Sequence, residues 1–240
     1  MKAHNIIFLL CLLGAAVSEA KYFRFWRGEI KTDLPYVEFQ NGLNTLFVPA
    51  TGALAQTPAR LVSYQPVLLS QSLTQRYNLP TEIALVEYES EQTYQNFRST
   101  PAGQHYSRMH WDYFDQQKSR SLVALKYNST LELNRAYWHS LKNDFSVASL
   151  YSFIKIYSRE KPISAGRWLD GVTQHLERVS AQNPEALIFL VDEDYVMEYS
   201  LWSTGADRFD PHFEAVSQLV LNSQLFEGRI LEPDTGIKFK

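Results

Sequence analysis

Short apolar runs alternate with amphipathic stretches along most of this chain, and the pattern predicts strands and helices in turn. Tyr22 to Ile30 alternate bulky aromatic with charged side chains, which predicts a strand with one buried face. A ragged apolar stripe from Val37 to Phe47 predicts a helix. Arg60 to Leu69 and Ile83 to Glu89 predict two further strands, and Pro66 places the first of these at an edge or a bulge.

The two helices predicted after the second of these strands have clear start signals. Ser90 stands where an N-cap belongs, and Glu91 adds negative charge to the first turn, where the helix dipole favours it. Pro101 forces a break before a second helical piece from about Ala102 to Phe114. A fourth strand, Ser121 to Tyr127, completes the order β-α-β-β-α-β, which is that of a ferredoxin-like module.

The second half of the chain predicts the same order of elements. Val147 to Tyr157 is a strand, and Ser164 to Asn183 contains an amphipathic helix. Ala186 to Val191 and Tyr195 to Tyr199 form a hairpin, and a last helix is predicted from Asp210 to Gly228.

A connector with a helix around Leu131 to Leu141 separates the two halves. We therefore expect an α+β fold of two tandem ferredoxin-like modules, residues 21–127 and 146–240, joined by a helical connector at 128–145. The modules are expected to pack as an internal α/β barrel.

Residues 1–20 have the composition of a secretory signal peptide. Lys2 supplies a positive start, Ile6 to Val17 is apolar, and small residues precede the predicted cleavage after Ala20. The apolar run is too short to span a membrane, so no membrane insertion is expected after cleavage. Cys11, the only cysteine, is lost with this segment. A mature protein without disulfides points to a periplasmic protein or one secreted into the medium.

The net charge of −3, without any basic run, argues against nucleic acid as a partner. The abundance of aromatic residues favours a small-molecule ligand instead. The pattern leaves open whether the protein is a monomer or a homodimer.

The stretch EIALVEYESEQTYQNFRSTPAGQHYSRMHW, which begins at Glu82, resembles the dimeric α/β-barrel superfamily in its strand, helix cap and aromatic spacing. The resemblance implies two sheets face to face, with a cavity between each sheet and its helices. Relatives use that cavity for cofactor-free oxygenation, haem breakdown, isomerisation or lyase chemistry, or for none of these. Haem-degrading members carry an asparagine on the first strand and a tryptophan near Phe97, which this chain lacks. No cofactor is therefore expected, and haem remains an alternative without support.

Two histidines are the main candidates for proton chemistry. Tyr106 and Phe114 flank His110 at i−4 and i+4, so they form an aromatic wall around a titratable imidazole. His175 returns to nearly the same helix face as Trp168. The alternative for His110 is a structural histidine hydrogen-bonded to a carbonyl. The catalytic candidates are His110, Tyr106 and His175, and the ligand-binding candidates are Trp111, Phe114, Trp168 and Tyr88.

No metal site is expected. His105 and His110 are five residues apart, which places them on different sides of a helix. The three acids at 192–194 are explained by a hairpin turn rather than a cation site. Two function classes stay open: a cofactor-independent oxygenase, isomerase or lyase, or a non-catalytic envelope or extracellular binding protein.

Overall fold

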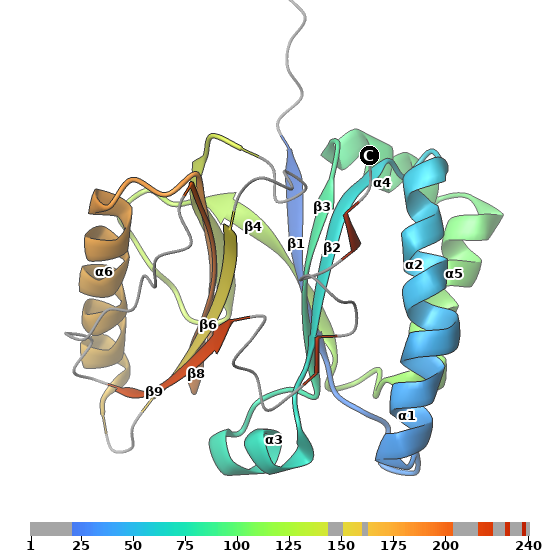
Figure 1. Cartoon of the computed structure of the whole chain (residues 1–240), viewed down its shortest axis with the longest axis horizontal. Coiled ribbons are helices and arrows are strands. Elements are labelled where there is room, and N and C mark those ends of the chain that lie inside the picture. The colour runs from blue at the N-terminus through green and yellow to red at the C-terminus, as the bar shows by residue number, and fades with distance from the viewer. Residues whose placement is uncertain are drawn as a thin grey trace, which may run out of the picture.

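A computed structural model describes residues 21–143, 151–159, 163–203, 216–222, 229–230 and 237–238. It shows a mixed α+β fold in which one 11-stranded sheet curls until its two halves face each other, with most helices on the outside (Figure 1). The strands are β1 (Tyr22–Gly28), β2 (Leu61–Leu68), β3 (Glu82–Tyr88), β4 (Arg120–Lys126), β5 (Arg135–Leu141), β6 (Tyr151–Arg159), β7 (Ala186–Val191), β8 (Tyr195–Trp202), β9 (Val216–Asn222), β10 (Arg229–Ile230) and β11 (Ile237–Lys238). The helices are α1 (Tyr36–Gly42), the π-helix η1 (Leu43–Phe47), α2 (Val48–Ala53), the 3-10 helix η2 (Leu54–Gln56), α3 (Gln71–Tyr77), α4 (Glu91–Arg98), α5 (Pro101–Tyr113) and α6 (Ala165–Ala181).

The first half of the sheet has the strand order β2-β3-β1-β4, and all its neighbours are antiparallel. This is the order that a ferredoxin-like βαββαβ chain produces, because each helical crossover skips one strand position. The second half has the order β7-β8-β6-β9, also antiparallel. Strand β5 joins the halves by pairing in parallel with β4 and antiparallel with β7.

Three apolar cores hold these layers together. The first lies between the two half-sheets, where Phe25 meets Tyr199 edge to face at 5.5 Å between ring centroids. The Tyr199 hydroxyl also donates to the backbone oxygen of Gln65 across the interior at 3.0 Å. The second core fills the space between the first half-sheet and helices α1, η1, α2, α4 and α5, and the third lies between the second half-sheet and α6. The described residues between the two half-sheets therefore form a packed core.

The helix start signals are confirmed. The Ser90 hydroxyl accepts from the backbone N–H of Thr93 at 3.1 Å, and the Thr93 hydroxyl accepts from the N–H of Ser90 at 3.2 Å. This reciprocal capping box satisfies two donors at the start of α4. At the start of α6, the Ser164 hydroxyl accepts from the backbone N–H of Arg167, a single capping bond.

Two predicted helices are wrong. Leu131 to Leu141 was expected to be helical, but Arg135–Leu141 forms strand β5, because β4 and β7 offer hydrogen-bonding edges on both sides. The helix predicted from Asp210 to Gly228 contains strand β9 at Val216–Asn222, paired with β6. The remainder of that segment and the predicted signal peptide at 1–20 lie outside the described residues. None of the helices that the structure describes is long and apolar enough to cross a membrane.

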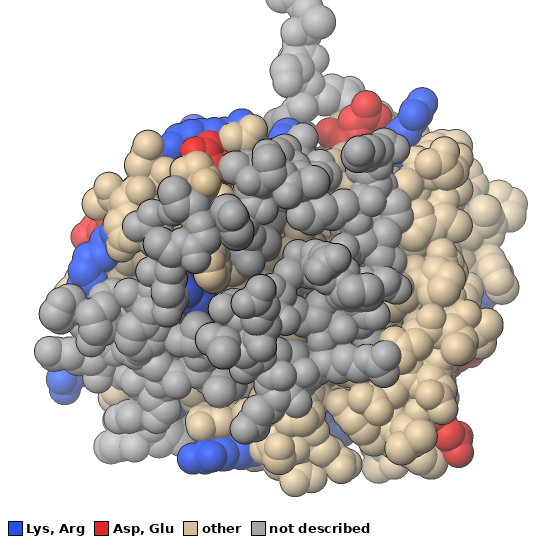
Figure 2. Space-filling model, viewed as in Figure 1, with Lys and Arg blue, Asp and Glu red and all other residues tan. Residues whose placement is uncertain are grey.

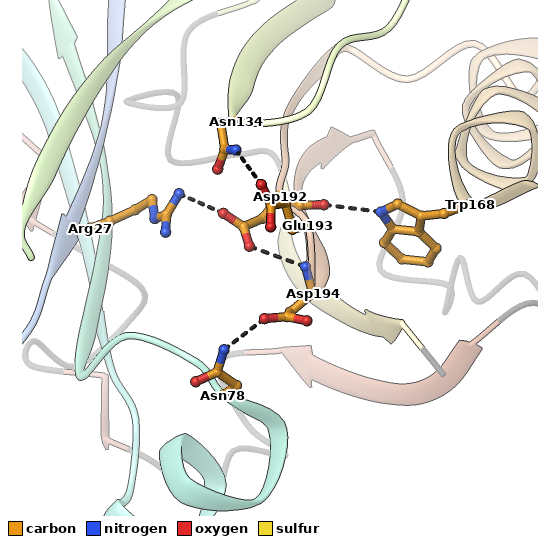
Figure 3. Close-up of polar contacts among 7 residues, drawn as sticks. All are labelled: Arg27, Asn78, Asn134, Trp168, Asp192, Glu193 and Asp194. Carbon is orange, nitrogen blue, oxygen red and sulfur yellow. Dashed lines mark hydrogen bonds and ion pairs between the residues drawn. The ribbon is translucent and has the colours of Figure 1, made fainter. Parts of the chain in front are cut away.

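The acidic hairpin between β7 and β8 connects the two halves of the molecule (Figure 3). Asp192 accepts from the guanidinium of Arg27 at 2.6 Å, and Asp194 accepts from the side-chain amide of Asn78 at 2.6 Å. The backbone oxygen of Asp192 also accepts from the indole of Trp168 at 3.0 Å. The two aspartates thus point at different partners in the first half of the chain, and the turn interpretation fits them better than a shared cation.

The outer surface over α1 and α2 carries little charge. Glu38 is the one acidic or basic residue between Tyr36 and Gln56. Val37 and Leu46 are 66% and 57% exposed there. Figure 2 shows the same side of the molecule as a broad surface with few charged atoms.

Gly103 fixes the elbow between α4 and α5. A Cβ at this position would lie 2.1 Å from the backbone oxygen of Phe97, so the two helices approach too closely for any side chain. Gly103 also lines the cavity described below.

We expect Gly103→Ala to lower the free energy of unfolding by about 1–3 kcal/mol, because a backbone contact must be pushed apart. Gly166→Ala is the matched control, since its Cβ would meet no described atom within 4 Å. That variant should gain about 0.5–1 kcal/mol from helix propensity. Urea unfolding followed by circular dichroism measures both, and equal effects in the two variants would contradict the close contact at Gly103.

Candidate functional site

A cavity of about 320 Å³ lies between the outer face of the first half-sheet and helices η1, α4 and α5. Its size falls within the range of pockets that hold small organic ligands. Its walls are largely aromatic, and the aromatic and imidazole side chains that line it are Trp26, Phe47, Tyr64, Tyr88, Tyr94, Phe97, Tyr106, His110 and Trp111.

Strand alternation places the cavity floor. On β1, Phe23 and Phe25 enter the core between the half-sheets, so Trp26 faces the helices. On β3, Ile83 and Leu85 point into the same interior, which leaves Glu82, Ala84, Val86 and Tyr88 on the helix side. The floor of the cavity is thus decided by the register of two neighbouring central strands.

His110 projects from α5 into the aromatic wall. Its ring lies 4.8 Å from Trp26, 4.6 Å from Phe47 and 5.1 Å from Tyr106, edge to face in each case. Burial in these surroundings lowers the pKa of His110 to about 4, so the imidazole is neutral near pH 7.

The tautomer of His110 follows from its partner. Nδ1 lies 3.2 Å from the backbone oxygen of Tyr106, which can only accept, so Nδ1 carries the proton. Nε2 then holds a lone pair in the neutral ring and can accept a proton. The expected aromatic wall and the expected carbonyl bond are therefore both present at one histidine.

Tyr106 is held in place from two sides. Its hydroxyl lies 2.7 Å from the hydroxyl of Thr51, and its ring stacks on Phe47 at 5.7 Å. Burial raises the pKa of Tyr106 above its ordinary range, so the phenol stays protonated and acts as a hydrogen-bonding group.

A buried carboxyl group lies behind the floor of the cavity. Glu82 accepts from the indole N–H of Trp26 and from the hydroxyl of Tyr64, each at 2.9 Å. Burial raises the pKa of Glu82 to about 7, although both hydrogen bonds favour the carboxylate. Glu82 orients two side chains that line the cavity and is itself fully buried.

The structure separates the predicted site residues into two groups. His110, Tyr106, Trp111 and Tyr88 all line the cavity. Phe114 is buried beside it, with its ring 5.2 Å from that of Trp26.

The other two predicted residues belong to the second half of the molecule. Trp168 and His175 are fully buried in the core between α6 and the second half-sheet. His175 Nε2 lies 2.8 Å from a carboxylate oxygen of Glu198. Burial alone would raise the pKa of Glu198, but the bond to His175 and the nearby charges of His175 and Lys155 bring it below its ordinary value. Neither Trp168 nor His175 lines the cavity that contains His110.

Sequence reasoning missed Trp26, Tyr64 and Glu82. One signal for Glu82 was present on β3. Glu82 and the predicted ligand residue Tyr88 are an even number of positions apart, so their side chains lie on the same face of the strand. The pairing of Glu82 with Trp26 and Tyr64, however, joins three strands and depends on their register.

No group of metal ligands is found among the residues that the structure describes. His105 is exposed on the same helix as His110 and does not line the cavity. His139 lies near the hydroxyl of Ser180, away from this site.

Several solved structures are loosely similar to this chain. A "Putative monooxygenase" from Fusobacterium nucleatum superimposes with a TM-score of 0.45 at 9% identity, covering 92% of this chain and 98% of that one. A "Putative monooxygenase" from Lactobacillus acidophilus gives 0.41 at 7% identity, covering 84% and 92%. A dimeric ferredoxin-like protein of unknown function from Bacteroides fragilis gives 0.34 at 11% identity, covering 43% and 93%.

No protein-family model and no curated protein matches the chain. The case for a function therefore depends on the geometry of the cavity.

The two buried titrating groups predict opposing effects of pH on stability. Glu82 has a raised pKa in the folded state. Its contribution to the free energy of unfolding is therefore complete below about pH 4.5 and is lost as the pH rises to about 7. His110 has a lowered pKa, so the folded state gains stability as the pH rises from about 4 to 6.5. Each effect amounts to roughly 3 kcal/mol at most, and in the natural protein the two oppose each other.

In the Glu82→Gln variant, we expect the free energy of unfolding to rise more steeply between pH 4 and 6.5 than it does in the natural protein. The His110→Asn variant can keep the bond to the Tyr106 carbonyl. Its free energy of unfolding should fall between pH 4.5 and 7. Urea unfolding of both variants and the natural protein across this range measures the slopes. Parallel pH profiles for all three proteins would show that neither group has a shifted pKa.

Proposed function

We propose that this protein binds a small aromatic molecule in the cavity between the first half-sheet and helices α4 and α5, and removes a proton from it. The observation that carries this proposal is the neutral His110, with its Nε2 lone pair, inside an aromatic cavity of ligand size. Because its pKa is low, His110 is unprotonated near pH 7 and available to accept a proton, although the same low pKa makes it a weaker base than a free imidazole. The aromatic enclosure excludes water from the reacting atoms.

The residues around His110 have different roles in the proposed reaction. The Thr51 hydroxyl donates to the backbone oxygen of Phe47, so Tyr106 donates to Thr51, and the phenol oxygen of Tyr106 can accept a hydrogen bond from a donor of the ligand. Trp26 and Tyr64, both oriented by Glu82, form a rigid floor against which an aromatic ring can pack. Removal of a proton beside a carbonyl or phenol is the shared first step of isomerases, lyases and cofactor-independent oxygenases.

The proposal includes the architecture and the location. The strand orders of the two halves support two tandem ferredoxin-like modules. The composition of residues 1–20 supports export to the periplasm or the medium.

Filling the cavity tests binding. Val86 lines the cavity floor, so Val86→Phe should weaken binding of a bicyclic aromatic probe such as 2-tetralone by at least about tenfold through steric exclusion. Quenching of tryptophan fluorescence reports binding, since Trp26 and Trp111 both line the cavity. The surface variant Val37→Phe is the control, because Val37 is 66% exposed on α1. Equal loss in both variants, or none in either, would place the probe elsewhere.

Proton removal is tested with the same probe, which carries acidic C–H groups beside its carbonyl. In D₂O the natural protein should accelerate exchange of these hydrogens for deuterium, followed by NMR. His110→Asn should reduce the acceleration by about 100-fold or more, while the dissociation constant changes by less than about threefold. His105→Asn, on the exposed side of the same helix, should keep full exchange activity.

Binding without accelerated exchange in the natural protein would overturn the catalytic part of the proposal. The non-catalytic ligand-binding protein would then be the correct function class.

A further inference from the structure

One cationic side chain lies among the aromatic residues of the cavity. Arg24 of β1 lines the cavity and is half-buried. The other two arginines along the cavity are placed differently. Arg98 is exposed at the end of α4, and Arg120 pairs with Arg27 in the register of β4 with β1. Because paired residues share a sheet face, the Arg120 side chain belongs to the opposite face from Arg24.

The guanidinium of Arg24 is held in place by neutral groups. It donates to the hydroxyls of Tyr22 at 2.7 Å and Ser121 at 2.9 Å, and it lies 4.7 Å from the ring centroid of Tyr94. A third, longer contact of 3.5 Å reaches the backbone oxygen of Ser121. An arginine has five N–H donors in a fixed fork, so these contacts orient the group without using all of its donors.

No carboxylate within the described part of the chain forms an ion pair with Arg24, and the described residues lining the cavity include no aspartate or glutamate.

The second half-sheet offers an internal comparison. Lys155 occupies the helix-facing side of β6, and its register partner on β8 is Glu198. Arg24 occupies the same kind of position on β1, but its register partner on β3 is Val86. The second module supplies a carboxylate to its buried cation, and the first module does not.

We infer that the cavity takes an aromatic ligand bearing a carboxylate, and that Arg24 binds this group. The ring of the ligand packs on the aromatic walls, and its carboxylate receives the remaining N–H donors of an already oriented guanidinium. The inference rests on the proposed function, since it names the ligand class of the same cavity.

Calorimetric titration with 2-naphthoate and 2-naphthamide tests the inference, because the two probes share a ring system and differ in charge. The natural protein should bind the acid at least tenfold more tightly than the amide. Arg24→Gln should weaken binding of the acid by about tenfold or more and change binding of the amide by less than twofold. Arg24→Lys keeps the charge but loses the fork, so an intermediate affinity for the acid is expected.

Arg167→Gln is the matched control, since Arg167 is exposed on α6 in the other half of the molecule. Melting temperatures of all variants show whether they are folded. Equal affinity of the natural protein for acid and amide would overturn the role of Arg24 while leaving the proposed aromatic site intact. Equal weakening of both probes in Arg24→Gln would also overturn it, because a structural role does not discriminate charge. Failure of both probes to bind the natural protein would overturn the ligand class together with the proposed function.

Discussion

The central strands β1 and β3 must bury both of their faces, and the rest of the structure depends on this constraint. One face of each strand packs against the opposite half-sheet, and the other packs against helices. Because side chains alternate along a strand, a shift of one residue in the register would move Trp26 and Glu82 into the interior and Phe25 into the helix layer. The same alternation fixes both the packed interior and the floor of the cavity.

The two helix layers differ in how their charged side chains are paired. Between α6 and the second half-sheet, the polar groups Lys155, His175 and Glu198 lie close together and compensate one another's charge. Against the first half-sheet, Arg24 and His110 face an open volume. The first layer thus keeps a cation and a neutral imidazole beside an open volume, and the proposed function rests on this difference between the two layers.

Helix caps and helical spacing could be predicted from the sequence, because each depends on residues that are close together in the chain. Ser90 begins its helix where the capping pattern indicated, and the contact of Tyr106 with His110 was predictable from helical spacing alone. The contacts of Trp26 and Phe47 with His110 were not, because these residues lie on other elements. The segment at 131–141 was not predictable in this way, because a short apolar run fits a helix or a strand equally well. Pairing with β4 and β7 decides its structure, and these strands are distant in sequence.

The same reasoning explains why part of the candidate site was missed. Tyr106 and His110 are four residues apart on one helix, so their proximity is a property of the helix. The bonds from Trp26 and Tyr64 to Glu82 bring together side chains from three strands, and separations of 56 and 18 residues carry no local signal. A buried glutamate with a pKa near 7 is costly to retain, and its two donors both line the cavity. The cost of burying Glu82 is therefore linked to the positions of two side chains in the cavity floor, on which the proposed packing of an aromatic ring depends.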